Sequence, residues 1–229
     1  MEIKILVGCP TSEHKEYCLK EYIEAIKNLS YKNYNILLVD NSKDDRYYNK
    51  IKSLGINVIK DKYLERARDR IVHSRNIIRE YVLDNGYDYF LSLEQDVIPP
   101  KDIIERLLRH DKDIVSGVYF KEFITKSGLK NILPLLYNSK EGYEYLFQLN
   151  EDDISGNKLI KVRGCGLGCV LIKRKVLDVI KFRYDDKNKA FDDMWFSYDA
   201  NKKGFFIYSD TGVRCKHLIR EMNWNKIKK

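Results

Sequence analysis

The chain has 229 residues, of which 44% are hydrophobic and 33% are charged, an ordinary composition for a globular protein. This length suffices for one large α/β domain with a sizeable core, and the lack of any run of about 18 apolar residues excludes a transmembrane helix within it. The formal net charge of +8 suits an anionic partner. Because Lys and Arg are spread over most predicted helices, we interpret it as a lysine-rich solvated surface and expect no nucleic-acid partner.

The two ends of the chain bear on its expected location. The first ten residues, MEIKILVGCP, have the pattern of a strand and lack the basic start and long apolar region of a signal peptide. The five cysteines are odd in number and scattered, which also fits a cytoplasmic protein. The basic tail at 219–229 is expected to be frayed, with peripheral contact to the inner membrane surface as the alternative.

The first half alternates apolar strands with helices. Strands are predicted at residues 3–9, 35–40 and 56–60, and helices at 14–29 and 65–84. The strands are almost continuously apolar, which is typical of a mostly parallel sheet with helices on both faces. Ligands of such sheets bind at the carboxyl ends of the strands, where we expect one crevice to collect Pro10, Asp40 and Asp96.

The stretch around which the chain is organised is 87–100, YDYFLSLEQDVIPP. Its apolar residues predict a buried strand that ends at Glu94 and Asp96, and residues two apart in extended chain project to the same side. Two neighbouring carboxylates repel each other unless a cation or a proton lies between them. Hard divalent metals prefer oxygen ligands of this kind, and a diphosphate is the usual further ligand of such a metal. The alternative is a solvated acidic turn.

One positive charge falls within the apolar stripe of the helix predicted at 65–84. Arg75 lies one turn from both Ile71 and Ile78. A buried charge needs a partner, whereas an arginine at the edge of a stripe extends its guanidinium to water. The sequence leaves both interpretations open.

The second half has a different texture. The elements predicted there are a helix at 100–110, a strand at 113–120, a β-hairpin at 132–150 that turns near 139–142, and strands at 205–210 and 212–218. Gly164, Gly166 and Gly168 follow the hairpin at a density that indicates a tight backbone or close approach to a ligand. Their GxGxG spacing is not a dinucleotide fingerprint.

A last helix is predicted at 191–204, and it begins with Asp192 and Asp193. Carboxylates in the first turn are stabilised by the helix dipole and by free backbone N–H groups. That structural explanation suffices for this pair when it is considered alone.

The order of these motifs resembles the nucleotide-sugar glycosyltransferases of the GT-A fold, most closely the family-2 type. The resemblance is carried by VGCPT at 7–11, LLVDNSKDD at 37–45, SRN at 74–76, EQD at 94–96, VRGCGLGCVLIKR at 162–174, FDDMWF at 191–196 and CKH at 215–217. Such a resemblance implies a single Rossmann-like GT-A domain over 1–229, with a nucleotide-sugar-binding half at 1–110, an acceptor-side half at 111–218 and the tail at 219–229. Glu94 departs from the family's Asp-x-Asp pattern. The Gln-x-x-Arg-Trp signature of processive synthases is absent, which implies a non-processive enzyme.

The same resemblance implies roles for individual residues. Those expected to bind the donor nucleotide are Pro10, Thr11, Asp40, Asn41, Arg75, Glu94 and Gln95. Those expected to hold Mn²⁺ or Mg²⁺ are Asp96, Glu94 and His217. Asp193, or its neighbour Asp192, would be the catalytic base. Those expected on the acceptor side are Gly164, Gly166, Gly168 and Trp195.

The implied activity is metal-dependent, inverting transfer of a hexosyl group from a UDP-, GDP- or dTDP-linked donor to a hydroxyl of a glycan, lipid-linked or protein acceptor. One alternative is nucleotidyl transfer on the same fold, although the long glycine-rich loop typical of those enzymes is missing after the first strand. Another is a non-catalytic nucleotide or nucleic-acid binder, which the net charge prompts. A further alternative is a zinc site, for which the spacings are poor, formed by Cys165, Cys169, Cys215 and His217.

Overall fold

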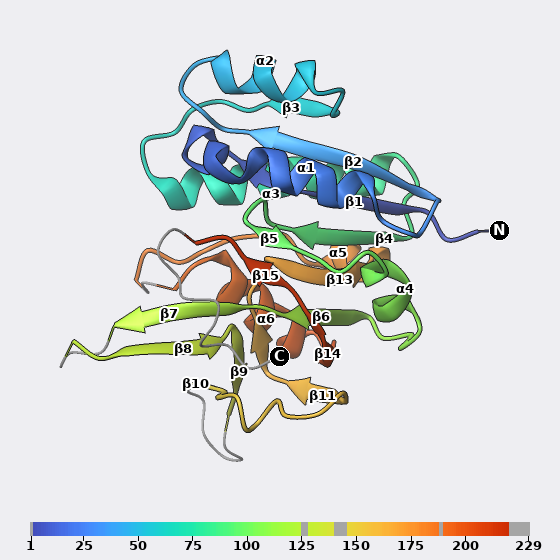
Figure 1. The fold of residues 1–229 in the computed structure, drawn as a ribbon, viewed down its shortest axis with the longest axis vertical. Helices are drawn as coiled ribbons and strands as arrows, with labels where there is room; N and C mark the ends of the chain where they lie inside the picture. The colour runs from blue at the N-terminus through green and yellow to red at the C-terminus, as the bar shows by residue number, and fades with distance from the viewer. Residues whose placement is uncertain (1, 125–127, 140–145, 188–189, 220–229) are drawn as a thin grey trace.

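The computed structural model describes residues 2–124, 128–139, 146–187 and 190–219. Its centre is a sheet of eight strands in the order β11-β14-β6-β13-β4-β1-β2-β3 (Figure 1). The strands are β1 (Ile5–Thr11), β2 (Tyr34–Asp40), β3 (Val58–Lys60), β4 (Tyr89–Leu93), β6 (Ile114–Val118), β11 (Leu159–Val162), β13 (Cys169–Lys173) and β14 (Ile207–Arg214). The β1–β2, β1–β4, β2–β3 and β6–β14 pairs are parallel, whereas β13 runs antiparallel to both of its neighbours and β11 runs antiparallel to β14. The predicted α/β class with a mostly parallel sheet is confirmed.

Helices cover both faces of this sheet, and each face has its own apolar core. Those on one face are α1 (Leu19–Lys27), α2 (Arg46–Ser53) and α4 (Ile103–Leu108). Those on the other are α3 (Ala67–Asp84), α5 (Arg174–Val179) and α6 (Asp192–Lys202). Successive strand residues alternate between the cores, so Val7 belongs to the first and Leu6 to the second. No helix of the described ranges is both long and apolar enough to cross a membrane.

The end of β1 differs from the predicted one. Pro10 and Thr11 were expected to stop the strand, but they continue it and pair with Val39 and Asp40 of β2. Strand β4 pairs with β1 only as far as Gly8, so Pro10 has a strand neighbour on one side alone within the described sheet, a position that tolerates proline. The helix expected at 14–29 begins with a 3₁₀ segment, η1 (Glu13–Cys18), and continues as α1.

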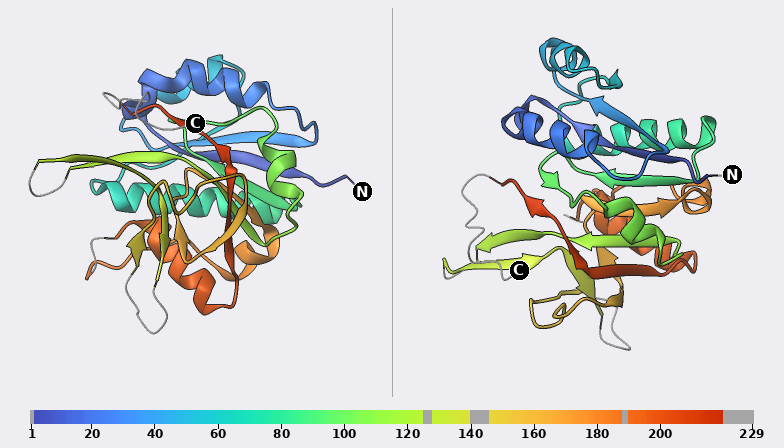
Figure 2. Two further views of the ribbon diagram at one scale, coloured as in Figure 1. Left: turned by 60° about the horizontal axis from the view of Figure 1, so that its bottom comes forward. Right: turned by 45° about the vertical axis from the view of Figure 1, so that its right-hand side comes forward.

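Two hairpins occur in the second half. Strands β9 (Leu136–Asn138) and β10 (Phe147–Gln148) pair antiparallel as predicted, although 140–145 in the expected turn lie outside the described residues. Strand β8 (Lys130–Pro134), which the sequence analysis placed partly in that hairpin, pairs instead with β7 (Phe120–Ile124). Figure 2 shows the β7–β8 arm projecting from the body of the molecule. Most of the predicted tail, 220–229, also lies outside the described residues.

A short antiparallel pair brings the end of the described chain beside the organising stretch. Strand β5 (Val97–Ile98) follows the EQD motif and pairs with β15 (Lys216–His217). His217 is the register partner of Val97, and its Nε2 lies 3.3 Å from Oδ2 of Asp96. This contact spans about half the length of the chain and carries no local sequence signal.

Candidate active site

A cavity of about 600 Å³ lies at the carboxyl ends of the central strands. Its wall combines segments from both halves of the chain: η1, α3, the EQD motif, β7, the start of α6 and β15. A smaller cavity of about 190 Å³ shares Lys15, Arg75 and Glu94 with it. Pro10 and Asp96 thus line two adjoining cavities and not the single expected crevice, and Asp40 lines neither of them.

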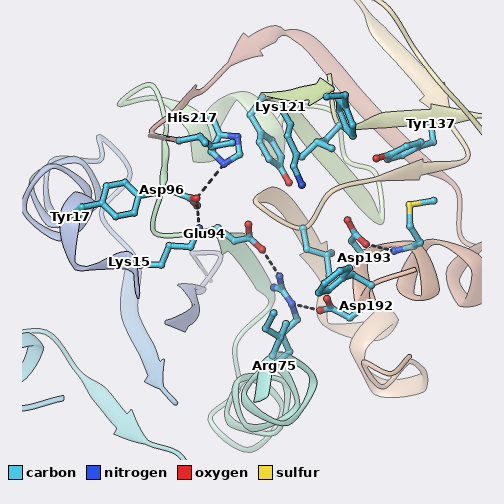
Figure 3. Close-up of a pocket in the computed structure, with 18 residues that line it drawn as sticks. Lys15, Tyr17, Arg75, Glu94, Asp96, Lys121, Tyr137, Asp192, Asp193 and His217 are labelled. Atoms are coloured by element: carbon cyan, nitrogen blue, oxygen red, sulfur yellow. Dashed lines mark hydrogen bonds and ion pairs between the residues drawn. The ribbon is translucent and has the colours of Figure 1, made fainter. Parts of the chain in front are cut away.

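Asp96 lies at the centre of a small charged cluster. Its Oδ2 accepts a hydrogen bond from Nζ of Lys15 and lies 3.3 Å from Nε2 of His217 (Figure 3). Its Oδ1 is buried and has no hydrogen-bond partner among the described residues. Burial alone would raise the pKa of Asp96, but the hydrogen bond from His217 and the charge of Lys15 lower it to about 2. Asp96 is therefore a carboxylate with one oxygen left for a further ligand.

His217 is oriented by the backbone. Its Nδ1 lies 2.7 Å from the carbonyl oxygen of Phe120, which can only accept, so Nδ1 carries the proton. Nε2 donates to Asp96 when the ring carries a second proton, and in the absence of that proton its lone pair can bind a metal ion. Histidines that bind metals commonly donate their other N–H to a backbone carbonyl in this way.

Glu94 has a different partner from Asp96. Its Oε1 accepts a hydrogen bond from Nη2 of Arg75 at 2.6 Å. Among the described residues, no three His, Cys, Asp or Glu side chains lie close enough together to bind one metal ion. Of the three residues expected to bind the metal, Asp96 and His217 are neighbours, whereas Glu94 pairs with Arg75. The donor chemistry of this pair, a carboxylate and an imidazole, fits Mn²⁺ better than Mg²⁺, which prefers oxygen ligands alone, if phosphate and water complete the coordination.

The sequence left open whether Arg75 is buried with a partner or extends to water, and the structure shows that it is buried. It is 2% exposed, and its guanidinium donates to the hydroxyl of Ser92 at 3.1 Å and pairs with Glu94 and Asp192. Burial disfavours its charge, but the charges of Asp192 and Glu94 raise the pKa of Arg75 above its usual range. One cation thus joins the EQD motif to the start of α6.

Asp192 and Asp193 occupy the first turn of α6, as predicted, but they face different surroundings. Figure 3 shows Asp192 directed at Arg75 and Asp193 directed into the cavity. Oδ1 of Asp193 accepts the backbone N–H of Met194 at 2.7 Å. Burial and the negative charge of Asp192 raise the pKa of Asp193 to about 6. The two neighbours therefore differ in their charged partners and in the direction of their carboxylates.

The glycine-rich stretch makes room for a side chain. A Cβ added to Gly166 would lie 2.1 Å from Oη of Tyr119, and one added to Gly168 would lie 2.6 Å from its Cζ. The N–H of Gly168 donates to the same hydroxyl at 2.9 Å. The sequence predicted a tight backbone or close approach to a ligand; the structure shows tight packing of these glycines against Tyr119, whose side chain lines the cavity.

The remaining predicted residues lie around the cavity or behind it. Thr11, Asn41 and Gln95 line the smaller cavity. Asp40 is fully buried, and its carboxylate accepts hydrogen bonds from Ser42 and Lys60. Gly164 packs against Ser197 of α6, and Trp195 packs against Arg183, so neither is part of the cavity wall.

The cysteines are part of the apolar core. Cys169 and Cys215 have their sulfur atoms 3.5 Å apart, and burial raises the pKa of Cys165 to about 12. His217 faces Asp96, and no metal-binding trio occurs among the described residues. The zinc alternative is therefore wrong for the part of the chain that the structure describes.

The cavity residues that the sequence analysis missed include Lys15, Tyr119, Lys121 and Tyr137. Lys15 follows the carboxyl end of β1 by four residues, so the rule that placed Pro10 at the site also applied to it. Lys121 and Tyr137 lie in strands, and Tyr119 lies between two strands, whose pairing could not be deduced from their own sequence.

Comparison with protein families identifies the family of this chain. The model of the family described as "Glycosyl transferase family 2" matches residues 11–180, well over half of the chain. The chain belongs to glycosyl transferase family 2. The family resemblance drawn from the sequence is confirmed, and with it the predicted class of enzyme, a glycosyltransferase.

Individual relatives of this family-2 chain are distant. It is 24% identical to a dolichol-phosphate mannosyltransferase of Pyrococcus furiosus over 241 residues, which cover 97% of this chain and 64% of that protein. Among solved structures, it is similar to GalNAc-T7 with UDP, GalNAc and Mn²⁺, with a TM-score of 0.67, 11% identity and coverage of 97% of this chain and 45% of that one. A197 from STIV gives a TM-score of 0.52 at 17% identity and covers 96% and 87%. At these identities the structural matches show the fold alone, and the expected GT-A fold is confirmed.

Proposed function

We propose that this protein transfers a hexosyl group from a nucleoside-diphosphate sugar to an acceptor hydroxyl, with inversion, and that Asp193 is the base. One observation carries the choice of base: Arg75 pairs with Asp192, whereas Asp193 is directed into the cavity. A base takes up a proton best when its pKa is near the working pH, and burial raises the pKa of Asp193 to about 6. An acceptor hydroxyl beside Asp193 would lose its proton as its oxygen attacks the anomeric carbon.

The donor diphosphate is proposed to lie beside Asp96. Lys15 and His217 flank this carboxylate, and Lys121 lines another part of the cavity. Oδ1 of Asp96 and Nε2 of His217 are the atoms that would hold a divalent cation. When bound, such a cation neutralises the charge of the leaving nucleoside diphosphate. The GalNAc-T7 structure, which holds UDP and Mn²⁺, supports this proposal by analogy of fold.

The acceptor is proposed to enter from the side of Tyr137 and Met194, which line the cavity; the backbone N–H of Met194 donates to Asp193. The Pyrococcus furiosus relative is named as a dolichol-phosphate mannosyltransferase, so a lipid phosphate is a further proposed class of acceptor, and mannose is a proposed donor sugar. A phosphate is already ionised at neutral pH and does not need a base, whereas a hydroxyl does. A protein with a lipid-linked acceptor would act at the inner membrane surface, where the basic tail of the sequence would contact anionic headgroups.

The test of this proposal is thermal unfolding of the purified protein with UDP, GDP or dTDP, each with and without Mn²⁺. A ligand that binds only the folded state adds about 2.7 kcal/mol of stability at a hundredfold excess over its Kd. We expect a metal-dependent shift with one nucleotide, and its loss in Asp96→Ala. If no nucleotide shifts the unfolding temperature, the proposed donor class is wrong.

A further inference from the structure

Lys15 contacts Asp96 in this structure, although the two residues are 81 positions apart in the chain. Its backbone is fixed at both ends of the residue: its N–H donates to the carbonyl of Ser12 at 2.9 Å, and its carbonyl accepts from Nε2 of Gln95 at 2.5 Å. Gln95 is the middle residue of the EQD motif and is 1% exposed. The motif therefore holds the backbone of Lys15 in place through Gln95 and pairs with its ammonium group through Asp96.

The ammonium group lies against Oδ2 of the carboxylate whose Oδ1 would bind a divalent cation. Asp96 is almost fully buried, and its Oδ2 is shared between Lys15 and Nε2 of His217. A divalent cation bound to Asp96 and His217 would lie within a few ångströms of this ammonium, and like charges at such distances repel strongly where water is scarce. The two cations cannot both be close neighbours of one carboxylate without loss of binding energy.

Lys15 has room to leave. Its side chain is 37% exposed, against 4% for that of Asp96, and it lines both the larger and the smaller cavity. A lysine carries its charge on a flexible four-carbon stem, so the ammonium can move while the backbone stays fixed. Both cavities open at the carboxyl ends of the strands, where the donor diphosphate is proposed to lie.

We infer that Lys15 is a built-in counter-ion of Asp96, which a divalent cation displaces and which then pairs with the diphosphate of the donor. This inference rests on the proposed metal and donor site. It implies that the two ligands bind cooperatively. Without nucleotide, Lys15 lowers the affinity of the site for the metal. With nucleotide, the displaced ammonium pairs with the diphosphate, so each ligand raises the affinity for the other.

The test is titration of Mn²⁺ into the protein without nucleotide, with free Mn²⁺ followed by electron paramagnetic resonance. We expect Lys15→Met to bind Mn²⁺ about tenfold more tightly than the unmodified chain, because the competing charge is gone. Lys121→Met removes the same charge from the same cavity without contact to Asp96 and should leave the Mn²⁺ affinity within about twofold of the original. Asp96→Ala should abolish the binding, which assigns the signal to this site.

A second measurement separates displacement from simple damage to the fold. With Mn²⁺ present, the nucleotide that stabilises the unmodified protein should stabilise Lys15→Met less, because the partner of the diphosphate is missing. Opposite effects on metal and nucleotide binding support the inference, since a misfolded variant would lose both. Equal or weaker Mn²⁺ binding by Lys15→Met overturns the inference and leaves the proposed function standing. If neither the unmodified protein nor Lys15→Met binds Mn²⁺, with or without the nucleotide, both the inference and the metal site are overturned.

Discussion

Arg75 and Asp192 form an ion pair in which both side chains are buried, 3% and 5% exposed. The same guanidinium reaches Glu94, so one residue of α3 connects the end of β4 with the first turn of α6. These segments are about a hundred residues apart in the chain and come from its two halves. The pair fixes the position of Asp192 and, through the backbone of α6, that of the proposed base beside it.

Removal of Arg75 should destabilise the fold strongly. Arg75→Met leaves two carboxylates close together without their cation, and loss of one partner of a buried pair costs about 3–5 kcal/mol. Arg66 is a suitable control because it also pairs with two carboxylates, Asp69 and Asp186, but its side chain is 62% exposed. Arg66→Met should cost much less, because exposed ion pairs contribute little to stability. Urea unfolding of both variants measures the difference, and equal costs would contradict the view of Arg75 as a buried structural cation.

Asp193→Asn should separate activity from stability. If Asp193 is the base, transfer to a hydroxyl acceptor should fall by about 10²–10⁴-fold. The same change removes a buried charge whose pKa is raised to about 6, so the free energy of unfolding at pH 7 should rise by roughly 1–3 kcal/mol. Asp192→Asn should instead lower stability, because it breaks the pair with Arg75. If Asp193→Asn keeps full transfer activity, the assignment of the base is wrong.

The rate of transfer should fall as the pH drops through about 6. Burial and the charge of Asp192 raise the pKa of Asp193 from 3.8 to about 6, and a base works only in its unprotonated form. The sign for stability is the reverse: the folded state binds this proton more tightly, so the contribution of Asp193 to the free energy of unfolding decreases as the pH rises from about 4 to about 6. A rate profile measured at saturating substrate, with a tenfold loss per unit below pH 6, checks the first statement. A flat profile from pH 5 to 7 would exclude Asp193 as the titrating base.

Local patterns predicted most elements of the first half, although α2 was not predicted. Apolar runs marked β1, β2 and β4, the apolar stripe marked α1 and α3, and the rule that ligands bind at strand ends placed Asp96 in the cavity. The break of the stripe at Arg75 was also readable, although the choice between a partner and water needed the structure. These signals are local because strand and helix periodicity reflect which side of each element is buried.

The features that the sequence did not reveal depend on contacts between distant segments. The insertion of β13 antiparallel between β4 and β6, and the pairing of β8 with β7, follow from long-range register that no short window contains. Lys15 had the spacing of an ordinary helix residue, and its position in the site became apparent only from its contact with Asp96, 81 residues away. The split between Asp192 and Asp193 likewise depends on which of two neighbours faces Arg75.

The glycines beside Tyr119 give the last prediction. Gly166→Ala would place a Cβ 2.1 Å from the hydroxyl of Tyr119, so the ring must move and the variant should lose about 1–3 kcal/mol of stability. Gly164→Ala is the matched control, because its Cβ would meet Ser197 at 3.4 Å, an ordinary contact, and should cost under about 1 kcal/mol.

Tyr119→Phe tests whether this hydroxyl is the obstacle. The change alone removes the acceptor of the Gly168 N–H and should cost about 1 kcal/mol. Combined with Gly166→Ala it should cost less than the sum of the two, because the nearest remaining atom of the ring lies 3.0 Å from the added Cβ. Thermal unfolding of the four proteins in this cycle gives the coupling. Strict additivity would mean that the glycine serves another purpose than making room for Tyr119.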